Sequence, residues 1–417
     1  MIGLMKMKGL TALFSEQPKN KSYVTRGEKE DGHILIVGGA GSGKTTCIAI
    51  PTLRAWREPV FVIDIKGELY DHSYEHRERR GRNIKVFNPQ GEYSYGYDPY
   101  FYLRKSLNPA QEARAIAQAL IPLPPNAKEP FWVDGAQNIL TGTILHFYRH
   151  HSFIDTLKII QSTGAQKLIE LLAQSDTEEA LLCVGSFVDM DIKVLSGFYG
   201  ELSRCIIPLV TDREIVSALS REDVISPLDL ESGADVYINI PEHLLRQWDK
   251  LLSLMINQFL NYFERRKLNE QDPVLFMLDE FPRLGKIPAI MDGLATLRGR
   301  KITISLIIQS LAQLDLIYGI EGRRVLVDNC AYKAILSAFD AESQEYFSKL
   351  VDTYDKIRIS KSTTKSPFLA FPSSKGAHET TEEKRIIKPS EFATLRDIVM
   401  LTPDGYFRVD KKPYYES

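Results

Sequence analysis

The sequence predicts an α/β fold in which a mostly parallel central sheet carries an inserted all-α domain. Three observations lead to this prediction. Short apolar runs alternate with helical patterns up to about residue 105, helical patterns alone fill 106–205, and apolar runs return in 206–417. Strands that alternate with helices build βαβ units and parallel sheets, so the two outer stretches are expected to form one domain.

The composition is that of an ordinary globular protein. The chain has 417 residues, of which 44% are hydrophobic and 25% charged, enough for two or three domains with a sizeable core. Its net charge of −2 provides no strong field for nucleic acid. Four widely spaced cysteines without a C-x-x-C pair indicate reduced thiols, and no apolar run approaches the roughly 18 residues that span a bilayer. We therefore expect a cytoplasmic chain without transmembrane helices.

The first stretch is expected to hold a polar N-terminal arm, 1–31, and the first part of the sheet domain, 32–105. Residues 44–57 carry a helical pattern between the first two predicted strands. The strands expected here are 34–37, 60–63 and 84–87.

The middle stretch, 106–205, is expected to be the all-α insert, because no strand-like alternation interrupts its helical periodicity. The helices expected in it are 109–120, 130–148, 154–162, 165–174, 177–188 and 192–210. The insert holds seven Lys and Arg against eleven Asp and Glu. A net acidic surface binds phosphate backbone poorly, so the insert is expected to dock protein partners.

The last stretch, 206–417, is expected to complete the sheet domain. A segment at about 360–384 is rich in Ser, Thr and Lys and is expected to be a flexible loop or an edge hairpin. The expected strands are 236–240, 274–278, 303–308 and 333–336, and the helices between them include 251–265 and 287–297.

A phosphate-binding loop pattern, G-x-x-x-x-G-K-[ST], directly follows the first predicted strand. Its glycines allow backbone N–H groups to converge on phosphate oxygens, Lys44 supplies a cation to the outer phosphates, and the Thr45 hydroxyl can ligate Mg²⁺. The residues expected to bind the nucleotide are Gly38, Gly39, Ala40, Gly41, Ser42, Gly43, Lys44, Thr45 and Thr46. They predict a nucleoside triphosphate site.

Two acids and an amide follow later strands and are expected to complete this site. The apolar run 274–278 ends in Asp279, which would hold Mg²⁺ together with Thr45, and in Glu280, which would deprotonate the attacking water. Gln309 follows the next strand and would sense the γ-phosphate or position water. An ordinary strand end is the alternative for each.

Four charged residues have two interpretations each. Arg298 and Arg300 either form a solvated basic turn or offer one arginine, Arg298 in preference, to the γ-phosphate of a neighbouring subunit. Asp64 and Lys66 close the second strand, so they face the nucleotide or a subunit boundary, or form a plain strand-to-helix turn.

Together these motifs resemble the coupling proteins of type IV secretion and conjugation systems, the TraG/TrwB class. The resemblance runs in order from about residue 30 to the end. The stretches that carry it are 61–70, 86–89, 130–132, 278–285, 294–299, 307–314, 328–330 and 413–415.

The resemblance implies a RecA-like phosphate-loop ATPase domain with an inserted all-α domain, and ATP and Mg²⁺ as cofactors. It implies hexamers with ATP between subunits and hydrolysis stimulated by DNA. It also implies delivery of a relaxase–DNA complex or protein substrate to the secretion channel and its ATPases, at the cytoplasmic face of the membrane. By position, Lys44, Asp279, Arg298 and Gln309 match functional residues of that family. Family members usually begin with transmembrane helices and this sequence predicts none, so membrane location is not carried over to this chain. The resemblance implies a hexamer on assembly, and the isolated chain can be a monomer.

Other functions fit the same motifs. A DNA translocase of the FtsK/HerA type would have no secretion role, and the helical insert disfavours it. A nucleotide-gated receptor or adaptor would use ATP to control assembly, and the intact acid Glu280 disfavours it.

Several further groups have no assigned role in the site. Two basic clusters are solvated faces, unless one of them contacts DNA phosphates in a central channel. They are Arg77, Arg79, Arg80, Arg82 and Lys85, and Lys356, Arg358, Lys361, Lys365 and Lys375. His146, His150 and His151 lack a further ligand at suitable spacing and are expected to be a surface cluster rather than a metal site. Trp132 and the other aromatic residues of the insert are expected in the core.

Overall fold

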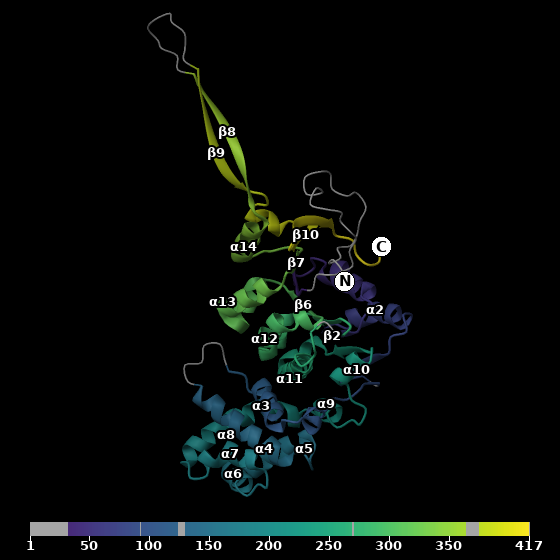
Figure 1. The fold of residues 1–417 in the computed structure, drawn as a ribbon, viewed down its shortest axis with the longest axis vertical. Coiled ribbons are helices and arrows are strands. Elements are labelled where there is room, and N and C mark those ends of the chain that lie inside the picture. Colours follow the sequence, from purple (N-terminus) through teal and green to yellow (C-terminus); the bar gives the residue numbers. More distant parts are fainter. Residues whose placement is uncertain (1–31, 92, 124–129, 269–270, 364–374, 417) are drawn as a thin grey trace, which may run out of the picture.

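A computed structural model describes residues 32–91, 93–123, 130–268, 271–363 and 375–416. The expected N-terminal arm lies outside this part of the chain. A sheet covered by helices forms the body, a group of helices lies at one end of it, and a long hairpin projects from the other end (Figure 1).

The central sheet has nine strands in the order β11-β10-β7-β1-β6-β5-β2-β4-β3. All seven strands from β7 to β3 in this order run parallel, and β10 and β11 are antiparallel additions at one edge. The strands are β1 Ile34–Val37, β2 Val60–Asp64, β3 Ile84–Phe87, β4 Asp235–Asn239, β5 Val274–Leu278, β6 Ile302–Ile308, β7 Tyr332–Ile335, β10 Asp397–Thr402 and β11 Gly405–Asp410. The expected α/β fold with a mostly parallel sheet is confirmed.

Helices cover both faces of the sheet because its strands are apolar on both sides. Along β2, Phe61 and Ile63 belong to one core cluster, and Val60 and Val62 belong to the other. Phe61 packs against Phe259 of α11, with ring centroids 4.7 Å apart. The helices of this domain are α1 Ile50–Ala55, α2 Glu68–Glu78, α10 Pro227–Glu231, α11 Leu245–Phe263, α12 Pro288–Thr296, α13 Leu311–Asn329 and α14 Ala341–Val351.

The inserted stretch is helical, as its periodicity indicates. Its central helix, α4, contacts α3, α7 and α8. The helices are α3 Pro109–Leu120, α4 Phe131–Phe147, α5 Phe153–Thr163, α6 Ala165–Leu172, α7 Glu178–Val184, α8 Ile192–Thr211 and α9 Arg213–Ala218. The expected boundary at residue 205 therefore falls inside α8, and the helical stretch continues through α9. No change of periodicity marks this boundary in the sequence.

Two aromatic residues of the insert are more exposed than expected. Phe131 is 53% exposed and Trp132 is 38% exposed, so they lie at the surface rather than in the core. Both rings pack on the buried ring of Phe198, with centroids 4.8 and 5.4 Å away. The position of these residues in the first turn of α4 leaves one side of each ring open.

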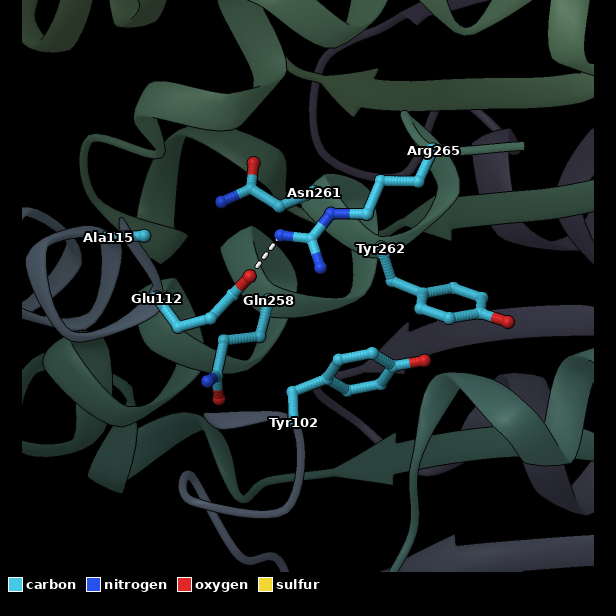
Figure 2. A pocket seen from close by; sticks show the side chains of 7 residues that line it. All are labelled: Tyr102, Glu112, Ala115, Gln258, Asn261, Tyr262 and Arg265. Atoms are coloured by element: carbon cyan, nitrogen blue, oxygen red, sulfur yellow. Dashed lines mark hydrogen bonds and ion pairs between the residues drawn. The ribbon is translucent and has the colours of Figure 1, made fainter. Parts of the chain in front are cut away.

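The insert and the sheet domain meet where α3 lies against α11 (Figure 2). Figure 2 shows the side chains that line a small pocket there, among them Arg265 and Glu112, which form an ion pair. The rings of Tyr102 and Tyr262 pack beside it with centroids 4.8 Å apart. The charged contact between Arg265 and Glu112 therefore joins the two parts.

The segment expected to be a flexible loop or hairpin forms two antiparallel strands, β8 Thr353–Thr363 and β9 Lys375–Arg385. They pair only with each other and project from the body (Figure 1). Residues 364–374, and the side chains of the second basic cluster, lie outside what the structure describes. Among the described residues, no helix is both long enough and apolar enough to cross a membrane.

Candidate nucleotide-binding site

The phosphate loop lies between the end of β1 and a π-helical turn, Lys44–Ala49, which continues into α1. Gly41 and Gly43 adopt φ values of 70° and 95°, which are unfavourable for other residues. At Gly38 a Cβ atom would lie 2.3 Å from the Ser42 hydroxyl oxygen. The glycine spacing is therefore required by the backbone of this loop.

Lys44 is held inside the loop. Its ammonium group donates to the carbonyl oxygens of Gly38 and Gly39, at 2.6 and 3.2 Å. Burial lowers the pKa of Lys44, and the nearby carboxylates of Glu280 and Asp279 act in the opposite direction. The cation is thus placed between the loop and the two acids, where the outer phosphates of a nucleotide would bind.

The acids and the amide converge beside this loop because of the strand order. β6 lies between β1 and β5, and parallel pairing sets Val37 opposite Ile308 and Leu278 opposite Leu306. The carboxyl ends of the three strands therefore lie at one edge of the sheet. This edge is where open α/β sheets bind their ligands.

Glu280 and Gln309 are in direct contact. The amide nitrogen of Gln309 donates to both carboxylate oxygens of Glu280, at 3.2 and 3.0 Å. Glu280 is only 6% exposed and has a φ of 45°, an uncommon conformation for a residue other than glycine. Such strain is typical of functional sites, where surrounding contacts hold it in place.

Asp279 is buried beside other carboxylates. Burial, followed by the charges of Glu280 and Asp64, raises the pKa of Asp279 to about 7, and Lys44 opposes this shift. Thr45 lies in the first turn after the loop and is half-buried. A carboxylate and a hydroxyl suit Mg²⁺, which usually binds through one or two protein oxygens, substrate phosphates and water.

The Ser42 side chain of the loop has a polar atom that is unpaired in the described part of the chain. The buried Ser42 hydroxyl oxygen makes no hydrogen bond within the described residues. A phosphate oxygen would supply that partner. The loop, its cation and its donors therefore fit a bound polyphosphate.

Asp64 and Lys66 have different surroundings in the structure. The Asp64 carboxylate accepts the backbone N–H groups of Gly67 and Tyr70 at 2.9 and 2.7 Å, which caps the start of α2. Burial raises its pKa to about 6. This is the strand-to-helix turn among the alternatives, although Asp64 also lies close enough to act on Asp279. Lys66 is exposed, and its charge acts on Lys44.

Arg298 lies at the other end of β6. It belongs to a short 3₁₀ turn, Arg298–Arg300, that precedes this seven-residue strand. At about 3.3 Å per residue, roughly 20 Å of strand separate Arg298 from the phosphate loop of its own chain. Arg298 is exposed, whereas Arg300 donates to the Thr296 carbonyl at 2.8 Å.

The first basic cluster is largely used within the fold. Arg77 is fully buried and donates to both carboxylate oxygens of Asp235 at 2.7 Å, so the expectation of a solvated or DNA-binding Arg77 is wrong. Lys85 pairs with Asp229 at 2.7 Å. Position along the chain alone did not reveal these ion pairs, because the acidic partners lie far away in the sequence, on β4 and α10.

One histidine of the cluster at the end of α4 is hydrogen-bonded to a serine. His146 shares a hydrogen bond of 2.7 Å with the Ser175 hydroxyl. In the part of the chain that the structure describes, no group of three or more His, Cys, Asp or Glu side chains is arranged for a metal ion.

Two residues that support the loop were not anticipated. The Ser337 hydroxyl accepts the Gly39 N–H at 2.9 Å, and the Phe339 ring lies where a side chain on Gly39 would project. Both follow β7. The rule that polar residues after parallel strands gather at one edge could have identified Ser337.

Fold and site together define an α/β protein with a phosphate-loop motif and a helical insert. The sequence profile described as "Type IV secretory system Conjugative DNA transfer" matches residues 5–417. The chain belongs to this family, which confirms the resemblance to type IV coupling proteins.

Relatives agree with this assignment. Protein VirD4 of Agrobacterium fabrum is 29% identical over 347 residues, which cover 80% of this chain and 51% of that protein. The type IV secretion system-coupling protein VirD4 of Bartonella henselae is 24% identical over 342 residues, 76% of this chain and 52% of that protein. The chain thus spans about half the length of these relatives.

Solved structures of a bacterial conjugative coupling protein, TrwB, share the fold. The unbound form has a TM-score of 0.69 at 16% identity and covers 92% of this chain and 86% of that one. TrwB in complex with a non-hydrolysable ATP analogue also has a TM-score of 0.69 at 16% identity, and the match covers 91% of this chain and 85% of that one. TrwB with ADP and Mg²⁺ has a TM-score of 0.64 at 15% identity, and the match covers 91% of this chain and 85% of that one.

Proposed function

We propose that this chain is the ATP-hydrolysing part of a type IV secretion coupling protein. It would recruit a relaxase–DNA complex or protein substrate and deliver it to the channel at the cytoplasmic face of the membrane. One observation carries the proposal: Lys44, Asp279, Glu280 and Gln309 converge at one sheet edge in a member of this family.

ATP and Mg²⁺ are the proposed ligands. The phosphate loop would hold the polyphosphate from Gly38 to Thr46, with Lys44 on the outer phosphates. Thr45 and Asp279 would hold Mg²⁺, which supplies positive charge to the β- and γ-phosphate oxygens when bound. The TrwB complexes with an ATP analogue and with ADP and Mg²⁺ support this choice.

Glu280 is the proposed base. Its carboxylate would take the proton of the attacking water, because it lies beside Asp279 and Lys44 at the edge where the γ-phosphate would bind. Gln309 holds this carboxylate through both oxygens and would place the water against the γ-phosphate. Arg298 lies too far from its own loop and would serve the site of a neighbouring subunit, as an arginine finger does.

The remaining parts of the proposal concern partners. A hexamer with DNA-stimulated hydrolysis is proposed from the family and from the position of Arg298. The acidic insert is proposed to dock the relaxase or another secretion substrate. The first basic cluster contributes little to DNA binding here, because Arg77 and Lys85 already have acidic partners.

The proposal is tested with a Glu280→Gln variant, with the ATPase rate and oligomer size measured together with and without DNA. Removing the base should lower the rate at least 100-fold while ATP binding persists. Glu75→Gln, on the exposed face of α2, is the control and should match the unmodified protein. Full substrate transfer by Glu280→Gln would contradict the motor and favour a nucleotide-gated adaptor. Movement along DNA without relaxase binding would favour a translocase.

A further inference from the structure

The C-terminal segment, defined here as residues 411–416, returns from β11 to the helix that follows the phosphate loop. Lys411 fixes its beginning: the ammonium group donates to the carbonyl oxygens of Leu336 and Leu395 at 2.9 and 2.8 Å. Figure 1 shows this end of the chain beside α2. The segment therefore lies next to the nucleotide site although the sequence separates the two widely.

One hydrogen bond joins the segment to the phosphate-loop helix. The Tyr414 N–H donates to the Thr46 carbonyl at 2.9 Å. This carbonyl lacks a helical partner: in the π-helical turn the Ile50 N–H bonds to Thr45, and the next residue, Pro51, has no N–H. Tyr414 thus satisfies a carbonyl that the helix itself cannot pair.

The two tyrosines of the segment differ in what surrounds them. The Tyr414 ring is held between Arg54, whose guanidinium carbon lies 4.5 Å from the ring centroid, and His72, whose ring centroid is 4.9 Å away. Tyr415 is 67% exposed and meets Tyr414 edge-on at 5.3 Å. Tyr414 is therefore an anchor, and it presents the Tyr415 ring to solvent.

The segment lies on the side of the phosphate loop where the nucleoside would leave it, because Tyr414 bonds to Thr46 and the charge of Glu416 acts on Cys47. In such loops the lysine reaches the β- and γ-phosphates, and backbone N–H groups hold the α- and β-phosphates. The nucleoside end of the ligand is then on the side of Thr46 and Cys47. Cys47 is half-buried and lies close enough to Lys411 and Glu416 for their charges to act on it.

We propose that residues 411–416 form the nucleoside side of the site and that the Tyr415 ring stacks on the nucleobase. This inference rests on the proposed function. Every base has a π-face, so stacking tolerates different bases and favours the larger purines over pyrimidines. The segment would distinguish a nucleoside triphosphate from a bare polyphosphate.

The test compares two probes, ATP–Mg²⁺ and inorganic tripolyphosphate, by titration calorimetry on the full chain. Tyr415→Ala should weaken ATP binding about tenfold and leave the tripolyphosphate affinity unchanged. Tyr415→Phe, which keeps the ring, should bind both probes like the unmodified chain. Tyr93→Ala removes another exposed tyrosine, near the opposite edge of the sheet after β3, and is the matched control.

Two results would overturn the inference. Unchanged ATP affinity in Tyr415→Ala would remove the stacking role. Equal losses for ATP and tripolyphosphate would show that the segment only braces the loop. If the unmodified chain binds neither probe, the proposed function fails and this inference fails with it, a result distinct from the other two.

Discussion

Asp279 is buried among charges, and this makes the free protein sensitive to pH. Its pKa is raised to about 7, first by burial and then by Glu280 and Asp64. A carboxyl group with a raised pKa binds its proton more tightly in the folded state than in the unfolded chain. The stability it contributes is therefore full below about pH 4 and is lost as the pH rises through about 7.

Asp279→Asn should remove this loss of stability at higher pH, because the amide stays uncharged. We expect the free energy of unfolding without nucleotide to rise by on the order of 4 kcal/mol at pH 8 and to change little at pH 4. Urea unfolding at the two pH values measures this, with the exposed Asp71→Asn as control. The same variant should lose Mg²⁺-dependent ATP binding. A stability profile with the unmodified slope between pH 4 and 7 would contradict the assignment of the titrating group.

Arg77 and Asp235 form a fully buried ion pair, which also receives support from the backbone. Asp235 accepts the Val60 N–H at 3.1 Å, and Arg77 donates to the Glu58 carbonyl at 2.7 Å. Removing one partner leaves the other charge buried and unpaired. Arg77→Met should therefore lower the free energy of unfolding by about 3–5 kcal/mol.

Urea unfolding of Arg77→Met and of Arg79→Ala compares the loss of a buried arginine with the loss of an exposed one in the same basic cluster. Arg79 is exposed and pairs with the exposed Glu75 one helical turn before it, so its removal should change stability by no more than about 0.5 kcal/mol. Similar stabilities for the two variants would mean that the buried pair is not formed in solution.

At the scale of elements, strand β6 holds Arg298 and Gln309 apart, one at each of its ends. Gln309 follows its carboxyl end and contacts Glu280, whereas Arg298 precedes its amino end. One strand thus carries an amide beside Glu280 at one end and an arginine at its other end, on the opposite side of the domain. The role proposed for Arg298 therefore requires a site to which another subunit contributes the phosphate loop.

Mixing two inactive variants tests this arrangement. Arg298→Ala and Glu280→Gln should each lose most ATPase activity as separate proteins. In a mixed assembly, an Arg298→Ala subunit keeps its own Glu280 and can receive Arg298 from a Glu280→Gln neighbour. Equal random mixing should restore about a quarter of the sites. Absence of any recovery in assemblies shown to be mixed would contradict action between subunits, and Arg300→Ala serves as the comparison variant.

At the scale of the molecule, much of the architecture follows from local pattern. The apolar runs located the strands β1 to β7, and uninterrupted helical periodicity located α3 to α8. The expected end of the insert, residue 205, falls inside α8, because α8 and α9 continue the same periodicity up to the return of the chain to the sheet. Periodicity reports the local conformation and carries no information about which domain a helix joins.

The sequence by itself determined the phosphate loop and the strand ends, because glycine conformations, apolar runs and the residues that follow them are properties of neighbours along the chain. Only the tertiary structure decided which distant residues meet: Gln309 on Glu280, Asp235 on Arg77, and Tyr414 on Thr46. These contacts depend on the order of strands in the sheet and on how the chain returns to it. Both are set by burial of the whole core rather than by any local segment.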